Sequence, residues 1–274
     1  MRPIFIYPGS FCPPTYGHAE IAKRTANLFR KITVICSSNP EKESLWFSPE
    51  ECKQMWQTYE LCPGIAVKTF SEFTETNIEI NELVMIRGIR DNRDLDYEKN
   101  VVVFNRENFG IVNYLYVISD KGFRHISSTS ARELAGRLDL LELGEQVSPL
   151  VVTRMLEKVL NIRNLYMVVG KPGSGKSTFL RMLCEKNPEN VFINTDSFSF
   201  QLRPLLEEAF GNVDLVDIAI NRSEELKEVI GKPWLELTKK SLRSVPRNSN
   251  VFLEIPYGFQ EDKMFFRFFG GKII

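Results

Sequence analysis

The sequence has few of the features that mark secreted, membrane-bound or nucleic-acid-binding proteins. Its five cysteines are odd in number and include no C-x-x-C pair, which favours reduced thiols over a disulfide framework or a zinc site. Lys and Arg together number 35, as do Asp and Glu, so the composition predicts no nucleic-acid partner. The apolar stretch at the start is too short for a signal peptide, and no window is long enough to span a membrane. We therefore expect a cytoplasmic protein with no membrane partner.

Two phosphate-binding patterns are present in a chain of 274 residues, a length that fits about two domains. Residues 10–18 read SFCPPTYGH and follow the apolar run 4–7, while residues 170–178 read GKPGSGKST and follow the run 165–169. Each pattern lies between a strand-like and a helix-like run, where the backbone N–H groups at a helix N-terminus can hold a phosphate. The sequence therefore predicts two nucleotide-binding units in tandem.

Strands and helices alternate in both predicted units. In the first unit, strands are predicted over residues 3–7, 32–37, 65–70, 83–86 and 114–118. Helices are predicted between the first two strands, after a capping box at Ser48, over residues 95–109, after a cap at Ser130 and over residues 149–160. In the second unit, strands are predicted over residues 165–169, 191–193 and 251–255, with another beginning at residues 271–274.

This alternation predicts an α/β protein with two doubly wound parallel sheets, the first Rossmann-like and the second a P-loop NTPase fold. We expect the first domain to cover residues 1–160 and the second residues 165–274, the second being either minimal or incomplete. Ligands of such sheets bind beyond the carboxyl ends of the strands. Residues 10–18, 87–90 and 127–129 would then lie at one edge of the first sheet.

Several side chains at that edge suit the transfer of a nucleotidyl group. Ser10 can hold phosphate oxygens, His18 at a helix start can donate to the reacting phosphate, and Lys42 can reach the same edge. Arg87 and Arg90 present planar forks that match phosphate. Each residue also has a plain structural explanation as part of a turn, a helix cap or a solvated surface. Their coincidence at one edge favours a site.

The segment YPGSFCPPTYGH resembles the first signature of the nucleotidyltransferase superfamily, in the form used by phosphopantetheine adenylyltransferases. The segments NPEKESLWFSPEE, VMIRGIRDNRDLDYE and HISSTSAREL agree with that family in order and spacing, and the resemblance covers about residues 1–160. It implies attack by the 4′-phosphate of phosphopantetheine on the α-phosphorus of ATP, giving dephospho-coenzyme A and pyrophosphate, with Mg²⁺ bridging phosphates. Relatives often form hexamers, so the resemblance leaves a homo-oligomer open.

The resemblance also implies roles for individual residues. His18, Lys42 and Arg90 would be catalytic, and Ser10, Lys42, Thr74 and Arg87 would contact the acceptor. The residues expected to contact ATP are Ser10, Phe11, His18, Gly88, Ile89, Arg90, Glu98, Phe123, Arg124, His125, Ile126, Ser127, Ser128 and Thr129. Cys12 stands where the family usually has Asp. From its place on a helix approach we expect a lowered thiol pKa and labelling by alkylating agents that ATP blocks.

The second pattern matches the phosphate-binding loop G-x-x-x-x-G-K-[ST] in full. Its glycines allow backbone N–H groups to wrap the phosphates, Lys176 reaches the β and γ oxygens, and Ser177 binds Mg²⁺. The loop residues are Gly170, Gly173, Ser174, Gly175, Lys176, Ser177 and Thr178. Asp196 follows the next strand, where it either orients or deprotonates an acceptor hydroxyl, or caps a helix.

Three functions remain open for the whole chain. The second domain resembles dephospho-coenzyme A kinase, which would phosphorylate the product of the first domain. A second reading is a nicotinamide-nucleotide adenylyltransferase joined to a ribosylnicotinamide kinase, against which the IRGIR and DLDYE segments argue. In a third, the second domain senses nucleotides without turnover.

Overall fold

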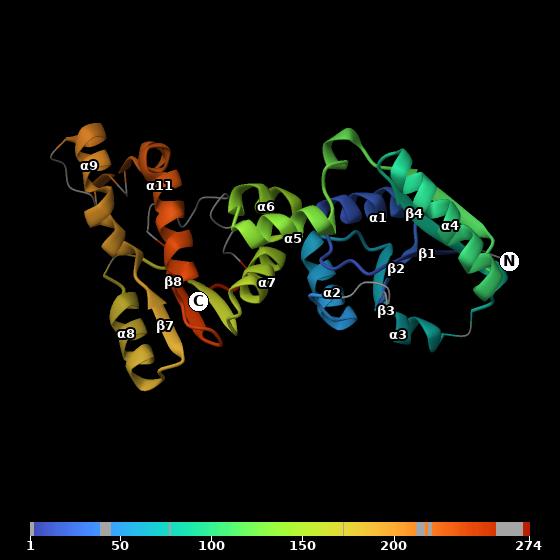
Figure 1. Ribbon diagram of the computed structural model, residues 1–274, viewed down its shortest axis with the longest axis horizontal. Helices are drawn as coiled ribbons and strands as arrows, with labels where there is room; N and C mark the ends of the chain where they lie inside the picture. The colour runs from blue at the N-terminus through green and yellow to red at the C-terminus, as the bar shows by residue number, and fades with distance from the viewer. Residues whose placement is uncertain are drawn as a thin grey trace. The chain divides into compact units, whose positions relative to one another are not determined.

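The computed structural model describes residues 3–38, 45–76, 78–171, 173–211, 217–218, 221–255 and 271–274 (Figure 1). The chain divides into two compact units, Met1–Glu133 with Gln146–Ser148, and Leu134–Glu145 with Pro149–Ile274. This division groups helix α7 (Pro149–Leu160) with the second unit. The domain boundary expected between residues 160 and 165 stays a prediction. No helix among the described residues combines the length and the apolar character needed to cross a membrane.

The first unit is built on a parallel sheet of five strands. These are β1 (Ile4–Gly9), β2 (Ile32–Cys36), β3 (Ile65–Thr69), β4 (Leu83–Ile89) and β5 (Asn113–Ile118), in the order β3-β2-β1-β4-β5. All neighbours are parallel, with Ile6 opposite Thr33 and Ile4 opposite Leu83. The chain first runs outward from β1 to β2 and β3, then crosses back to β4. The reversal places a topological switch point between β1 and β4, where ligands of such sheets bind.

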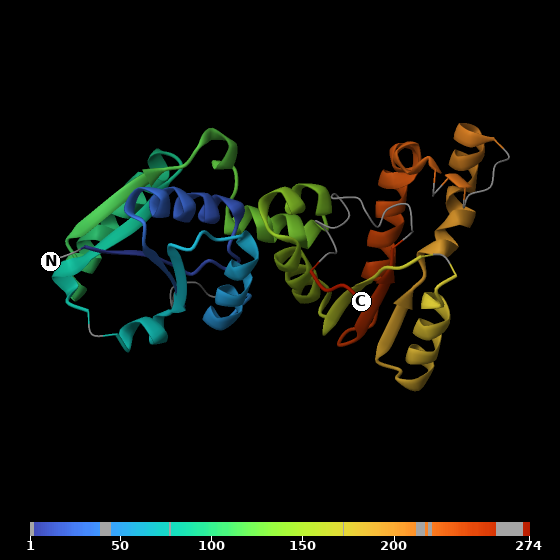
Figure 2. The ribbon, with the colours of Figure 1, turned by 180° about the vertical axis from the view of Figure 1, so that it is seen from behind.

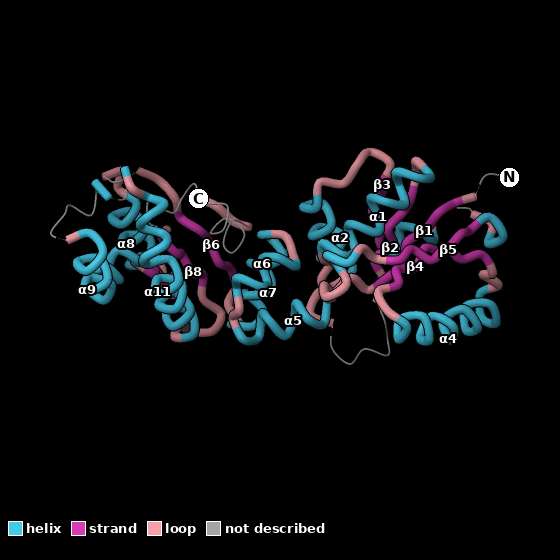
Figure 3. Tube along the Cα trace, turned by 90° about the horizontal axis from the view of Figure 1, so that it is seen from above, coloured by secondary structure: helices cyan, strands magenta, loops and turns pink. Residues whose placement is uncertain are grey.

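Helices cover both faces of this sheet. The helices of this unit are α1 (Tyr16–Phe29), α2 (Pro49–Trp56), α3 (Phe70–Thr74) and α4 (Asn92–Phe109), and α5 (Ser128–Arg137) begins in it and ends in the second unit. Adjacent residues of β4 point to opposite faces, and Gly88 lies against Ile21 of α1 while Arg87 reaches Glu98 of α4. Figure 3 shows α1 and α4 on opposite sides of the strands. Each face of the sheet therefore has a helix beside the switch point.

The helix starts in this unit depend on local side-chain caps. The capping box predicted at Ser48 is confirmed, since Glu51 N donates to Ser48 Oγ and Ser48 N donates to the Glu51 carboxylate. The cap predicted at Ser130 is wrong. Helix α5 begins at Ser128, and Ser127 Oγ accepts a bond of 3.0 Å from Ser130 N. Both positions are serine, so the sequence pattern alone did not separate them.

The second unit is built on a parallel sheet in the order β6-β8-β7, formed by β6 (Asn164–Val168), β7 (Asn190–Ile193) and β8 (Asn250–Glu254). Its helices are α6 (Leu140–Gln146), α7, α8 (Lys176–Lys186), α9 (Ser199–Phe210) and α11 (Ser223–Arg243). The strand expected at residues 271–274 begins as a parallel bridge between Ile273 and Met167 of β6. Figure 2 shows this red segment beside β6. The prediction of two α/β units with parallel sheets is confirmed.

A buried carboxylate joins the last residues to the rest of the second unit. Glu157 Oε1 on α7 accepts from Leu165 N at 2.8 Å and from Lys272 Nζ at 2.7 Å. Lys272 Nζ also donates to Asn164 Oδ1 at 2.7 Å. Because Glu157 is buried, these charged hydrogen bonds compensate its loss of water. The contacts hold α7, β6 and residues 271–274 together.

Candidate functional site

The loop after β1 is held by an aromatic residue in an unusual backbone conformation. Phe11 has φ 42°, in the left-handed region, and its side chain is buried. Its ring lies 5.1 Å from each of the rings of Tyr7, His18 and Trp56, edge to face. A non-glycine residue in this region costs about 1–3 kcal/mol and persists where packing determines it. The Phe11 ring therefore anchors the phosphate loop to β1, α1 and α2.

His18 caps helix α1, and the cap defines its tautomer. The backbone N–H of Thr15 donates to Nδ1 of His18 at 3.1 Å, while His18 N donates to Thr15 Oγ1 at 3.4 Å. Because Nδ1 accepts a proton donor, the neutral ring carries its own proton on Nε2. The two interpretations of His18 from the sequence are therefore compatible. The ring caps the helix with one nitrogen and presents an N–H donor with the other.

The two arginines at the end of β4 are both bound to carboxylates of α4. Arg87 donates to Glu98 from Nε at 2.7 Å and from Nη2 at 2.5 Å, and its Nη1 reaches the carbonyl oxygen of Pro8 at 3.2 Å. Arg90 donates to Asp94 from Nε at 2.8 Å and from Nη2 at 2.9 Å. Partial burial favours the neutral form of Asp94, but the hydrogen bonds and charge of Arg90 outweigh it and lower its pKa. Arg87 and Glu98, predicted to face different substrates, thus form one ion pair.

The start of α5 is fastened to the loop after β1. Ser128 Oγ donates to the carbonyl oxygen of Pro13 at 2.8 Å. Arg132 donates from Nη1 to the carbonyl oxygen of Cys12 at 2.5 Å and from Nη2 to Thr129 Oγ1 at 3.1 Å. The bonds to the carbonyl oxygens of Pro13 and Cys12 join two segments that are more than a hundred residues apart in the sequence. Arg132 lies inside the HISSTSAREL segment, but sequence reasoning did not single it out.

The remaining residues expected near ATP lie around this junction. Residues 121–123 form a 3₁₀ turn, Arg124 Nε donates to the carbonyl oxygen of Ser119 at 3.4 Å, and Ile126 is buried against Gly17. The backbone at Ile89 accepts a bond of 2.8 Å from Ser119 N. The structure therefore brings the loop after β1, the end of β4 and the start of α5 to one edge of the sheet. That these residues bind ATP stays a prediction.

Of the other residues expected at the acceptor side, one is described by the structure and is not joined to this edge. Thr74 lies at the end of α3, where its exposed hydroxyl donates to the carbonyl oxygen of Ser71 at 2.9 Å. Helix α3 follows β3, which is two strands away from β1 in the sheet. Lys42 lies outside the described residues.

Cys12 differs from the expectation of a readily labelled thiol. It is only 3% exposed, which contradicts easy access by alkylating agents. Its pKa is lowered to about 6, as expected in direction, but the main cause is a hydrogen bond from the Cys52 thiol. Burial opposes this shift without cancelling it. The thiol therefore belongs to a buried pair, away from solvent.

The phosphate-binding loop of the second unit has the expected setting between β6 and α8. Gly173 and Gly175 adopt φ values of 74° and 86°, which side chains with a Cβ rarely adopt. Lys176 Nζ donates to the carbonyl oxygens of Gly170 at 2.8 Å and Lys171 at 3.0 Å. The lysine therefore lies along the inside of its own loop.

Glu254 at the end of β8 faces this loop, and sequence reasoning missed it. Ser177 Oγ donates to its two carboxylate oxygens at 3.3 and 3.2 Å, and Lys176 Nζ lies 3.8 Å from Oε1. The side chain is only 3% exposed, and Thr195 Oγ1 donates to the Glu254 backbone carbonyl at 2.8 Å. The signal in the sequence was an acid ending the apolar run VFL. Its carboxylate and the Ser177 hydroxyl are oxygen donors of the kind that Mg²⁺ prefers.

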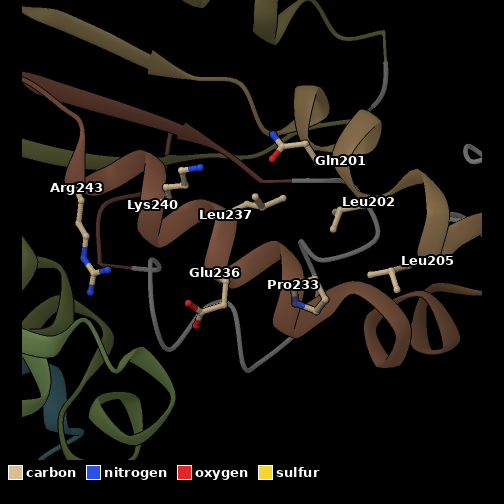
Figure 4. Close-up of a pocket in the computed structure, with 8 residues that line it drawn as sticks. All are labelled: Gln201, Leu202, Leu205, Pro233, Glu236, Leu237, Lys240 and Arg243. Atoms are coloured by element: carbon tan, nitrogen blue, oxygen red, sulfur yellow. The ribbon is translucent and has the colours of Figure 1, made fainter.

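Other features of the second unit bear on an acceptor site. The backbone of Asp196 lies in the 3₁₀ turn Thr195–Phe198, and its side chain is outside the described part of the structure. A groove of about 540 Å³ lies between α9 and α11 (Figure 4). It is lined by Gln201, Leu202, Leu205, Pro233, Glu236, Leu237, Lys240 and Arg243. No residue of the phosphate-binding loop lines it. Among the described residues, no three His, Cys, Asp or Glu side chains gather in a way that could hold a metal ion.

Two family models match the chain, one in each unit. Residues 6–134 match the cytidylyltransferase-like family, and residues 165–241 match the AAA domain family. The first part is 32% identical over 159 residues to phosphopantetheine adenylyltransferase of Mannheimia succiniciproducens, covering 58% of this chain and 99% of the relative. It is 31% identical over 154 residues to the Aquifex aeolicus enzyme of the same name, covering 56% and 94%.

Solved structures with similar features have low sequence identity. NadR in complex with NR is 17% identical with a TM-score of 0.39, covering 93% of this chain and 67% of that one. Nicotinic acid mononucleotide adenylyltransferase of Plasmodium falciparum is 17% identical with a TM-score of 0.44, covering 57% and 96%. The chain belongs to the phosphopantetheine adenylyltransferase family through its first part, and it is a nucleotidyltransferase that carries a P-loop domain after it.

Proposed function

We propose that the first unit transfers AMP from ATP to 4′-phosphopantetheine, giving dephospho-coenzyme A and pyrophosphate. The main support is the junction at the β1/β4 switch point, where Ser128 and Arg132 fasten the start of α5 to the loop after β1. This junction occurs in a chain similar to phosphopantetheine adenylyltransferases over almost their whole length.

In this proposal the side chains act by position and charge. The phosphate of the acceptor attacks the α-phosphorus in line, and pyrophosphate leaves, so no enzyme nucleophile is required. His18 offers its Nε2–H to the oxygen charge that grows in the transition state, which is where a fixed donor is most effective. Mg²⁺ held mainly by the substrate phosphates would neutralise further charge.

The test is an acceptor-dependent release of pyrophosphate. The full chain is incubated with ATP and Mg²⁺ and either 4′-phosphopantetheine or nicotinamide mononucleotide. We expect release with phosphopantetheine alone. Release with nicotinamide mononucleotide instead would transfer the assignment to the nicotinamide-nucleotide reading.

We further propose that the second unit binds ATP at residues 170–178 and phosphorylates the 3′-hydroxyl of dephospho-coenzyme A. Ser177 and Glu254 would hold Mg²⁺, which orients the phosphates and draws off charge. Lys176 would leave the loop carbonyls for the β and γ oxygens. Asp196, which follows β7 in the chain, would orient or deprotonate the acceptor hydroxyl.

Glu254→Gln tests this arrangement because the amide has the same shape but no charge. We expect Mg²⁺-dependent ATP binding to residues 170–178 to weaken by about tenfold or more, since a charged hydrogen bond is worth about 1.5–3 kcal/mol. Glu185→Gln, an exposed change on α8, is the control. Mass spectrometry of dephospho-coenzyme A incubated with unmodified protein shows whether a phosphate is added. Binding of ATP without that addition would leave the sensor reading in its place.

A further inference from the structure

We propose that Cys12 and Cys52 form an oxidisable pair, in which a disulfide ties the phosphate loop of the first unit to helix α2 and lowers adenylyl transfer. The bond would link a residue of the candidate site to one outside it, 40 positions along the sequence. The formation of the disulfide is independent of the proposed function. Its effect on turnover depends on that function.

The loop after β1 packs against α2, and this packing brings Cys12 close to Cys52. Phe11 packs edge to face on Trp56, and Cys12 Sγ lies 3.9 Å from the carbonyl oxygen of Phe47, just before the start of α2. Cys52 lies between these two contacts along the helix, one turn before Trp56 and on the same face. The loop thus contacts Phe47 before α2 and Trp56 at the end of α2, and Cys52 lies between these two positions.

The two thiols belong to one buried interface and interact with each other. Their interaction lowers the pKa of Cys12 and raises the pKa of Cys52. Cys12 is 3% exposed and Cys52 is 1% exposed. A thiolate in contact with a thiol is the pair that oxidation converts to a disulfide, and burial restricts the reaction to a small oxidant such as hydrogen peroxide.

The chemistry proceeds in two balanced steps. The Cys12 thiolate attacks hydrogen peroxide, breaks its O–O bond and becomes a sulfenic acid, while the released hydroxide takes up a proton to form water. The Cys52 sulfur then attacks the Cys12 sulfur and displaces the hydroxyl group, which leaves as a second water with the Cys52 proton. The two thiols lose two electrons, and the peroxide gains them.

A disulfide at this place would move the loop. Its S–S bond is about 2.05 Å long, shorter than any non-bonded contact of two sulfurs, so Cys12 must approach α2. Phe11 precedes Cys12, and Arg132 binds the Cys12 carbonyl oxygen. A shift of about 1 Å in a positioned catalytic group can cost about 10²-fold in rate. In a relative with Asp at this position the bond is chemically impossible.

The experiment treats the full chain with hydrogen peroxide, removes the oxidant, blocks the remaining thiols after denaturation and maps the linked peptides by mass spectrometry. Pyrophosphate release is measured before and after peroxide, and again after dithiothreitol. We expect a Cys12–Cys52 link and a loss of activity of about tenfold or more that dithiothreitol reverses. Cys52→Ser and Cys52→Ala should keep their activity through the same treatment. Cys62→Ser, a thiol of intermediate exposure in the same unit, should respond as the unmodified chain does.

Two results would overturn the proposal. One is a link from Cys52 to Cys36, the other buried thiol near it, or no link at all. The other is a loss of activity under peroxide that is equal in both Cys52 variants and in the unmodified chain. If the chain releases no pyrophosphate even before oxidation, the proposed function fails. The mapped peptides then still show whether the disulfide forms. ATP binding measured before and after peroxide shows whether the disulfide changes the site.

Discussion

His18 has two tasks that single substitutions can separate. His18→Ala removes both the Nε2–H donor and the cap that Nδ1 makes with Thr15 N. We expect kcat to fall about 10²–10³-fold, the usual loss for a donor that stabilises transition-state charge. The free energy of unfolding should fall by about 0.5–2 kcal/mol with the lost cap.

Thr15→Val is the matched control, because it removes the cap oxygen and keeps the ring. It should lower stability by a similar amount while changing kcat far less. Steady-state kinetics and thermal unfolding of the two variants measure both effects. If both variants lose the same turnover, His18 is a structural residue.

Arg132 acts through the backbone of another segment. Its planar fork bridges the Cys12 carbonyl oxygen and Thr129 Oγ1, which a single ammonium group cannot do with the same geometry. We expect Arg132→Lys to lower kcat/KM for ATP by about 10-fold to 10²-fold through misplacement of the loop. Arg137→Lys, an exposed change on the same helix, should leave it unchanged. Equal values for the two variants would rule out a positioning role for Arg132.

Among the secondary-structure elements, residues 271–274 are fitted tightly against α7. A Cβ added at Gly271 would lie 2.5 Å from Thr153 Oγ1 and 2.7 Å from Leu150 Cα. Because the second neighbour is backbone, the clash cannot be relieved by a rotamer change. Gly271→Ala should destabilise the second unit by about 1–3 kcal/mol, as overpacking does.

Gly231 in the interior of α11 offers a control, because substitution by alanine there should change stability in the opposite direction. A Cβ added there meets nothing within 4 Å. Gly231→Ala should stabilise the helix by up to about 1 kcal/mol, because alanine is the better helix former. Denaturant unfolding of both variants gives the comparison. A stabilised Gly271→Ala variant would contradict the packing described for this segment.

The elements themselves were largely predictable, because buried strands in parallel sheets are short apolar runs between turn residues. Most predicted and observed strands, such as 65–70 and Ile65–Thr69, differ by a residue or two, whereas β4 extends three residues beyond the predicted 83–86 and includes Arg87. The sequence could not show which groups, distant in the chain, the long side chains contact. Arg132 binds a carbonyl far away in the chain, and Glu254 looks like the last residue of an ordinary strand until Ser177 is placed beside it. The same holds for the contact of Cys12 with Cys52.

For the whole molecule, the two phosphate-binding loops belong to different sheets and share no described residue. Lys176→Ala should therefore abolish ATP binding at residues 170–178 and leave pyrophosphate release unchanged. Saturation binding of a fluorescent ATP analogue and the acceptor-dependent assay measure the two properties on one sample. A fall in pyrophosphate release in this variant would show that the sites are coupled.

The pairing of Arg87 and Arg90 with Glu98 and Asp94 has a consequence for how anions arrive. Each of these two guanidinium groups has a carboxylate within hydrogen-bonding distance, so their four charges cancel when seen from afar, in a chain whose formal net charge is zero. Beyond about 8–10 Å, where salt already screens the field, these residues exert little pull on a polyanion. Recognition would then begin at contact, when a phosphate competes with a carboxylate for the fork. Substituting both members of either ion pair by neutral residues should consequently leave the ionic-strength dependence of the ATP association rate almost unchanged.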